Sequence, residues 1–192
     1  MKNAILVFVF ALLVVCSKAG ADTQPLWKTV EGWDIRVDTT LENSCFLYSP
    51  FQDGTAFRVG FNRKTRLGHV IIGNSAWASL EPGKEYDLDV QFDAEAPWNG
   101  TGRAVKMGSE TLLVVEFGES DFLREFMRKQ AVVFRYKGRQ ITKLSLRGSS
   151  LAGAELVRCQ QAMNEARGYR EGQSSDPFSE NHKSSHRDPF SY

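Results

Sequence analysis

The chain has 192 residues, of which 24 are Lys or Arg and 23 are Asp or Glu. This near balance excludes the class of proteins that bind nucleic acid through clustered basic side chains, and it gives no reason to expect binding to an anionic membrane surface. The length is sufficient for one domain with a substantial hydrophobic core.

The first 21 residues have the three parts of a cleavable secretory signal. Lys2 provides the positive start, residues 4–15 are continuously apolar, and residues 19–21 are Ala-Gly-Ala. The apolar run is shorter than the roughly 20 residues that a membrane-spanning helix needs, and no second candidate follows. We therefore expect a periplasmic or secreted protein with no integral membrane segment after cleavage.

Strand-like alternation of apolar and polar residues follows. Residues 33–37 and 57–61 show it, and the clearest case is residues 86–92, where every second residue is apolar. Residues 70–72 and 112–115 are instead continuous apolar runs, which are typical of central strands covered on both faces.

Two further strands are expected at residues 132–136 and 141–146, joined by residues 137–140 (Lys-Gly-Arg-Gln) as a hairpin connection. One-sided alternation with short connections favours antiparallel pairing.

Helical spacing appears in two segments. Residues 122–127 carry an apolar stripe, which Ser120 can cap at its start. A second helix begins at Ser149 or Ser150 and ends near Gly168, and its apolar face is Ala152, Leu156, Cys159 and Met163. The predicted fold class is α+β, mainly antiparallel β in a sandwich or a sheet, with two packed helices in a single domain over residues 22–168.

The mature chain keeps two cysteines, Cys45 and Cys159. An isolated pair in an oxidising compartment favours a disulfide, and the position of Cys159 on a buried helix face allows it to attach the closing helix to the sheet. Two reduced, buried cysteines are the alternative. A metal site needs more soft ligands than this pair offers.

Residues 169–192 are rich in Ser, Gly, Asn, Asp and Glu and contain almost no aliphatic side chains. Such a segment cannot bury enough apolar surface to offset its ordering entropy, so we expect a disordered polar tail. The tail contains a short repeat, in which Asp-Pro-Phe-Ser occurs at residues 176–179 and again at residues 188–191.

No catalytic set, cofactor motif or metal site is predicted. His69 is the one histidine in the expected domain, where a structural or simply exposed role is favoured over a general base. The carboxylates Asp87, Asp89 and Asp93 alternate along one predicted strand. They could form an acid–base pair, but solvent-facing strand positions are the simpler interpretation.

One segment favours binding. Residues 97–102 (Pro-Trp-Asn-Gly-Thr-Gly) are predicted to be a loop that carries Trp98 and Asn99. Exposed tryptophans in loops are enriched where proteins contact ligands or partners, so these two residues are the candidate binding site. A tryptophan folded back against the edge of the sheet is the alternative.

Several features resemble the small exported proteins of proteobacteria that are grouped near the invasion-associated protein B family. These features are the signal, the strand at Cys45 followed by residues 56–59, the helix at residues 121–130, and the run 144–149 followed by a helix from Leu151. The resemblance implies a β-sandwich-like periplasmic or secreted protein without a known catalytic centre, and it assigns no site residues.

The sequence therefore predicts an exported, non-catalytic binding protein of the bacterial envelope that needs no cofactor. Its partner would be an unidentified protein or envelope component. Two alternatives stay open: a hydrolase that acts on envelope polymer through the strand carboxylates, and a structural factor that only contributes stability.

We expect the exported protein to begin at Asp22, because residues 19–21 place small side chains where signal peptidase reads them. N-terminal sequencing and the intact mass of the exported form measure this directly. A mass that still includes residues 4–15 would instead indicate a chain anchored by its signal.

Overall fold

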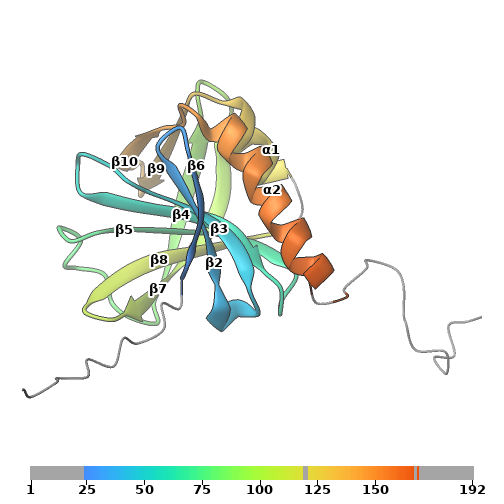
Figure 1. Ribbon diagram of the computed structural model, residues 1–192. Coiled ribbons are helices and arrows are strands. Elements are labelled where there is room, and N and C mark those ends of the chain that lie inside the picture. The colour runs from blue at the N-terminus through green and yellow to red at the C-terminus, as the bar shows by residue number, and fades with distance from the viewer. Residues whose placement is uncertain (1–23, 119–120, 167, 169–192) are drawn as a thin grey trace, which may run out of the picture.

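The computed structural model describes residues 24–118, 121–166 and 168, which form strands, a short 3-10 helix and two α-helices (Figure 1). The predicted signal and the predicted tail lie outside the described residues. The elements are β1 (Leu26–Val30), β2 (Trp33–Asp38), the 3-10 helix η1 (Thr39–Leu41), β3 (Ser44–Pro50), β4 (Thr55–Asn62), β5 (Leu67–Asn74), β6 (Glu85–Phe92), β7 (Trp98–Met107), β8 (Glu110–Phe117), α1 (Asp121–Arg128), β9 (Ala131–Tyr136), β10 (Arg139–Ser145) and α2 (Ser149–Ala166).

All the strands belong to one antiparallel sheet with the order β1-β2-β3-β4-β5-β8-β7-β6-β9-β10. The chain runs as a meander through β5 and crosses to β6. It then returns through β7 to β8, which pairs with β5. The predicted antiparallel α+β class is confirmed. Of the two expected arrangements, a sandwich or a sheet, the strands form a single sheet.

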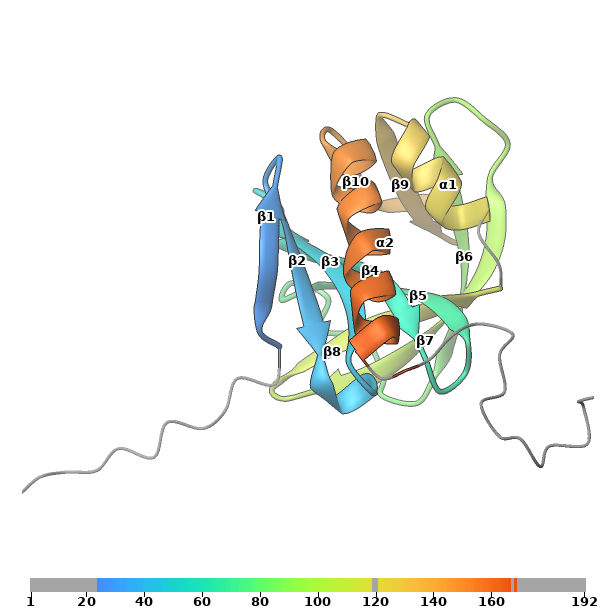
Figure 2. The ribbon, with the colours of Figure 1, turned by 45° about the vertical axis from the view of Figure 1, so that its right-hand side comes forward.

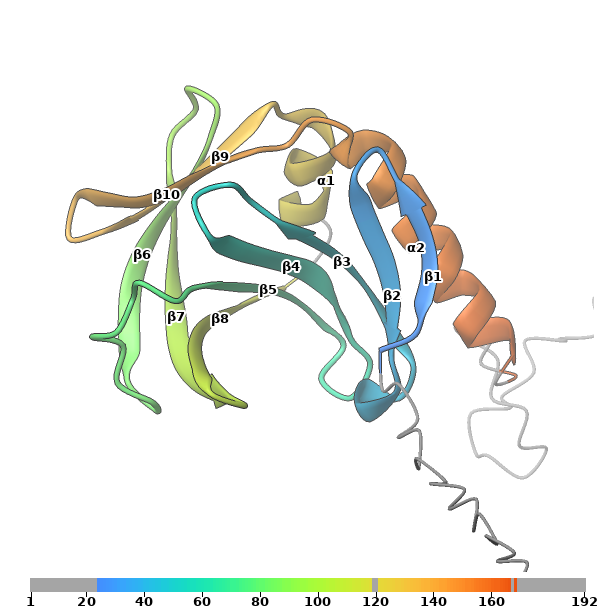
Figure 3. The ribbon, with the colours of Figure 1, turned by 60° about the vertical axis from the view of Figure 1, so that its left-hand side comes forward.

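The sheet is strongly curved (Figure 3). The buried apolar side chains of its strands belong to one core cluster. The hydroxyl oxygens of Thr55 in β4 and Thr142 in β10 lie 3.3 Å apart, which joins two strands distant in the sheet order. The enclosed core is rich in aromatic rings. The ring centroids of Trp33 and Phe126 are 5.3 Å apart, and those of Phe57 and Phe126 are 5.9 Å apart.

The strand periodicity of the sequence matches the burial of the side chains. In β6 the apolar positions at 86, 88, 90 and 92 are buried while Asp87 is exposed. The two continuous apolar runs lie in β5 and β8, which are neighbours in the middle of the sheet. Their central position was therefore predicted correctly, and Ile71, which faces away from the core, is buried as well.

The connection between β9 and β10 is shorter than expected. Only Lys137 and Gly138 separate the two strands, with φ angles of 49° and 73°. A two-residue turn with positive φ at both positions matches the natural twist of a hairpin, and glycine adopts such a conformation without strain.

Both predicted helices are present. The helix α2 lies along β1, β2 and β3, and α1 packs against α2 (Figure 2). The predicted faces are the buried ones: Phe122, Leu123 and Phe126 in α1, and Ala152, Leu156 and Cys159 in α2. Ser120 lies outside the described residues. Gly168 has φ 66° and donates its N–H to the Glu165 carbonyl, as a glycine that ends a helix does.

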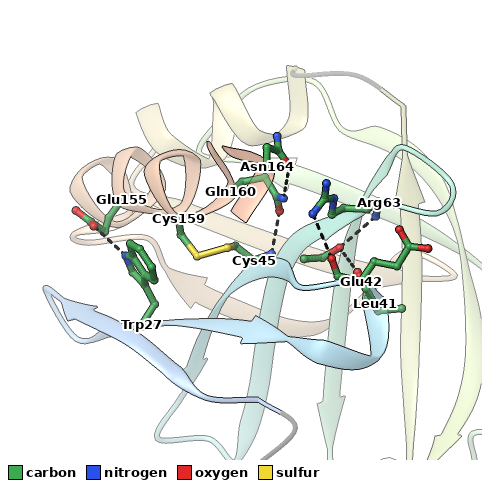
Figure 4. The surroundings of a disulfide bond; sticks show 10 residues. Trp27, Leu41, Glu42, Cys45, Arg63, Glu155, Cys159, Gln160 and Asn164 are labelled. Atoms are coloured by element: carbon green, nitrogen blue, oxygen red, sulfur yellow. Dashed lines mark hydrogen bonds between the residues drawn. A yellow bond between two sulfur atoms is a disulfide. The ribbon is translucent and has the colours of Figure 1, made fainter. Parts of the chain in front are cut away.

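The predicted disulfide is confirmed. Cys45 in β3 and Cys159 in α2 are bonded, with their Cα atoms 6.1 Å apart (Figure 4). Beside the bond, the Gln160 side-chain oxygen accepts a hydrogen bond of 2.9 Å from the backbone N–H of Cys45. Gln160 in turn donates to the Asn164 side chain at 3.1 Å. The last helix is thus attached to the sheet by one covalent bond and one adjoining hydrogen bond.

A second attachment joins α2 to β1. The Glu155 carboxylate accepts hydrogen bonds of 3.1 Å from the indole N–H of Trp27 and from Lys28 Nζ, and one of 3.2 Å from Arg158. The hydrogen bond from Trp27, followed by that from Lys28, lowers the pKa of Glu155. The first strand is therefore attached to the last helix through a single carboxylate.

We expect the double substitution Cys45→Ser/Cys159→Ser to lower the free energy of unfolding by about 4–5 kcal/mol, because the bond closes a loop of 114 residues in the unfolded chain. Denaturant titration measures the loss. Wild-type protein in reductant should lose a similar amount, whereas the double variant should not respond to reductant. Equal stability with and without the bond would contradict the expectation.

Candidate binding surface

Trp98 is the first residue of β7 and lies opposite Val90 of β6. The prediction that residues 97–102 form a loop is wrong, because residues 98–102 pair with β6 along its length. The Trp98 side chain is 37% exposed. Its ring meets Phe92 edge-on at 6.3 Å between centroids and Phe122 of α1 edge-on at 6.2 Å. Trp98 is therefore packed against the end of the core, as the alternative interpretation described, and still presents part of its indole to solvent.

The rings beneath Trp98 form a continuous cluster. Phe122 stacks on Phe117 at 4.5 Å and meets Phe92 at 5.2 Å. Edge-to-face and offset-stacked pairs at these distances are favourable beyond the area that they bury. The orientation of the exposed indole is thus set by Phe122 of α1 and Phe92 of β6, and Phe117 of β8 in turn supports Phe122.

Asn99 points to the opposite face of the sheet from Trp98, because successive side chains alternate along a strand. Asn99 is exposed and lies opposite Asp89 of β6, which itself lies opposite Arg135 of β9. The two predicted binding residues are therefore neighbours in the chain that occupy different surfaces. Both surfaces meet only at the edge of the sheet where β7 begins.

The three strand carboxylates do not form one group. Asp87 and Asp89 lie on the outer face of β6, as predicted for solvent-facing positions. Asp93 follows the strand with φ 49°, and its carboxylate accepts backbone hydrogen bonds of 3.1 Å from Gln130 and 2.9 Å from Ala131. Asp93 thus fixes the start of β9, and the expectation that it alternates along the strand with the other two was wrong.

His69 is the third residue of β5 and is 4% exposed. Burial, with a further contribution from the nearby Arg58 guanidinium, lowers its pKa to about 4 against the opposing effect of Asp38. The imidazole is therefore neutral at neutral pH. Its Nε2 atom has no hydrogen-bond partner among the described residues. Of the roles weighed for His69, the simply exposed one is wrong, and its burial fits the structural one.

The Arg58 guanidinium donates to the Asp38 carboxylate at 2.8 Å and lies 3.7 Å above the centre of the Phe46 ring. Asp38 also accepts from the Thr40 backbone at 2.9 Å. Burial acts to raise the pKa of Asp38, but the hydrogen bonds from Thr40 and Arg58 outweigh it and lower that pKa. This buried pair joins β2 to β4 beside His69.

A groove that the sequence did not reveal lies between α1 and the start of α2. Its lining residues are Leu123, Arg124, Met127, Arg128 and Ser150, and its volume is about 380 Å³. This volume is at the lower end of the range that is typical of ligand pockets. We call it the α1–α2 groove. The sequence does place Arg124 and Arg128 one helical turn apart, but it does not show that a second helix lies beside them.

Within the described ranges, no group of three or more His, Cys, Asp or Glu residues is placed to hold a metal ion. The same ranges contain no helix that is both long and apolar enough to cross a membrane.

Comparison with known proteins gives one informative match. No family model and no curated protein matches the chain. The crystal structure of invasion associated protein B from Bartonella henselae is similar in fold, with a TM-score of 0.53 and 13% sequence identity. The similarity covers 70% of this chain and 97% of that protein. The resemblance predicted from the sequence is thus confirmed at the level of the fold.

We expect acid to destabilise the protein through His69. Its pKa is about 4 in the folded chain against an ordinary value of 6.5, so the unfolded chain binds more protons between these values. The free energy of unfolding is therefore highest above pH 6.5 and decreases as the pH falls toward 4. His69 accounts for about 3 kcal/mol of this decrease. Denaturant titrations at several pH values measure the loss.

The matched control for this experiment is His69→Gln, whose side chain is neutral throughout the range. The difference between the pH dependences of wild type and variant isolates His69 from the carboxylates. Parallel pH profiles for the two proteins would show that His69 titrates normally and would contradict the expected shift.

Proposed function

We propose that this protein is an exported, non-catalytic binding protein of the bacterial envelope, and that Trp98 anchors its partner. The observation that carries the proposal is the half-exposed indole of Trp98, held by Phe92 and Phe122. A large aromatic side chain that is already fixed loses little conformational freedom on binding, so more of its contact energy contributes to affinity.

The disulfide supports the export part of the proposal. Disulfides persist in oxidising compartments such as the bacterial periplasm and are rare in the cytosol. The bond between Cys45 and Cys159 agrees with the signal predicted in the first 21 residues. The fold similarity to a bacterial protein described as invasion associated also fits an envelope role.

Asn99 enters the proposal as a separate contact. Trp98 and Asn99 face opposite sides of the sheet. A single partner can therefore contact both residues only if it covers the edge of the sheet at the start of β7. The polar side chains of Asp89 and Arg135 would then lie on the Asn99 side of that edge.

Substitution Trp98→Ala should weaken binding by about 2 kcal/mol, which is close to a thirtyfold rise in Kd. The partner is first recovered from envelope extract on the immobilised wild-type protein, and its affinity for each variant is then measured in purified form. Trp27→Ala is the matched control, because Trp27 is similarly exposed at 40% but lies on β1. Circular dichroism and the unfolding midpoint verify that each variant is folded.

Two outcomes would reject the proposal. Equal affinity of wild type and Trp98→Ala for every recovered partner would remove Trp98 from the interface. If the protein hydrolyses isolated envelope polymer and the Asp89→Asn variant does not, the protein is a hydrolase and not a binding protein.

A further inference from the structure

The floor of the α1–α2 groove is apolar. Leu123 and Met127 lie one turn apart on α1, on the side that meets α2. Gly153 of α2 permits this close approach, because a Cβ atom at that position would lie 2.4 Å from Met127 Cγ. The glycine thus lets the Met127 side chain lie between the helices, where it forms a lining of the groove.

The rim of the groove is positively charged. Arg124 and Arg128 project from α1 beside the floor, and Ser150 marks the first turn of α2. That first turn contains no acidic residue, so the positive end of the α2 dipole is not compensated from within the helix. Arg124 pairs with Asp121 at 2.6 Å with both side chains more than half exposed. Arg128 makes no salt bridge with any residue that the structure describes.

An apolar floor beneath two arginines favours a ligand that combines an aromatic side chain with a nearby carboxylate. The chain itself contains such a motif twice, in Asp-Pro-Phe-Ser at residues 176–179 and 188–191. In each copy a proline, which limits the conformations lost on binding, separates the acid from the phenylalanine.

The length of chain after α2 matches the distance to the groove. The groove lies at the start of α2, and a helix of 18 residues is about 27 Å long. From Gly168 to Phe190 there are 22 residues, and a flexible linker of that length has a root-mean-square span of roughly 23–28 Å. Intramolecular binding is strongest when the linker span matches the separation of the sites. Phe178 is 10 residues away and reaches about 33–36 Å only when nearly extended.

We propose that the α1–α2 groove binds the Asp-Pro-Phe-Ser motif of the chain's own C-terminal segment, chiefly the copy at residues 188–191. Phe190 contacts Leu123 and Met127, and the Asp188 carboxylate faces Arg124 and Arg128. The copy at residues 176–179, which has the shorter linker, can occupy the same groove in place of the copy at residues 188–191. This inference is independent of the partner proposed for Trp98, because Trp98 does not line the groove.

The test uses the full mature chain with ¹³C-labelled methionine methyl groups and NMR detection. Its methionines are Met107, Met127 and Met163, and Met127→Leu assigns the signal of the groove. A phenylalanine ring seated on Met127 shifts that signal by its ring current. We therefore expect the Met127 signal to move in Phe190→Ala, and to move further in Phe178→Ala/Phe190→Ala. The signals of Met107 and Met163 should stay in place.

Two further variants complete the design. Arg128→Glu reverses a rim charge and should move the Met127 signal in the same direction as the tail variants. His182→Ala alters the same tail outside both motifs and should leave it unchanged. A Met127 signal that does not respond to the double phenylalanine variant would overturn the proposal. A response that vanishes on dilution would also overturn it, since it would place the tail of a second copy in the groove.

Discussion

The bond between Cys45 and Cys159 is the constraint on which the placement of both helices depends. It holds α2 against β3, a strand near one end of the sheet order. With α2 fixed, α1 has a surface on which to pack, and Phe126 of α1 then enters the aromatic core beside Trp33. From the same helix, Phe122 supports Trp98 at the far end of the core. The candidate binding residue therefore depends on a covalent bond to which it makes no direct contact.

Much of this arrangement could be predicted from the sequence, because it depends on local periodicity. The alternation in residues 86–92 identifies a half-buried strand whatever lies beside it. The spacing of Ala152, Leu156 and Cys159 likewise identifies the buried face of a helix. Since that face contains one cysteine and the rest of the predicted mature chain contains one more, the pairing required no knowledge of the fold.

The failures concern contacts between segments distant in the sequence. Residues 97–102 contain Asn and Gly and were interpreted as a loop, but residues 98–102 pair with β6. Position 102 is a glycine within this strand because a Cβ atom there would lie 2.7 Å from Leu88 Cδ1. Asp93 was assigned to a solvent-facing row because its backbone partners, Gln130 and Ala131, lie far along the chain. The α1–α2 groove was missed for the same reason, since its lining comes from two helices.

The carboxylate of Glu155 links the beginning of the described chain to its end, and this bears on the order of folding. Trp27 and Lys28 belong to the first strand, whereas Glu155 lies in the last helix. During synthesis, β1 emerges more than a hundred residues before its helical partner. Contacts of such long sequence separation slow folding, because the loop between them must be ordered first. The nascent chain consequently cannot form the contacts of Glu155 with Trp27 and Lys28 until α2 has emerged.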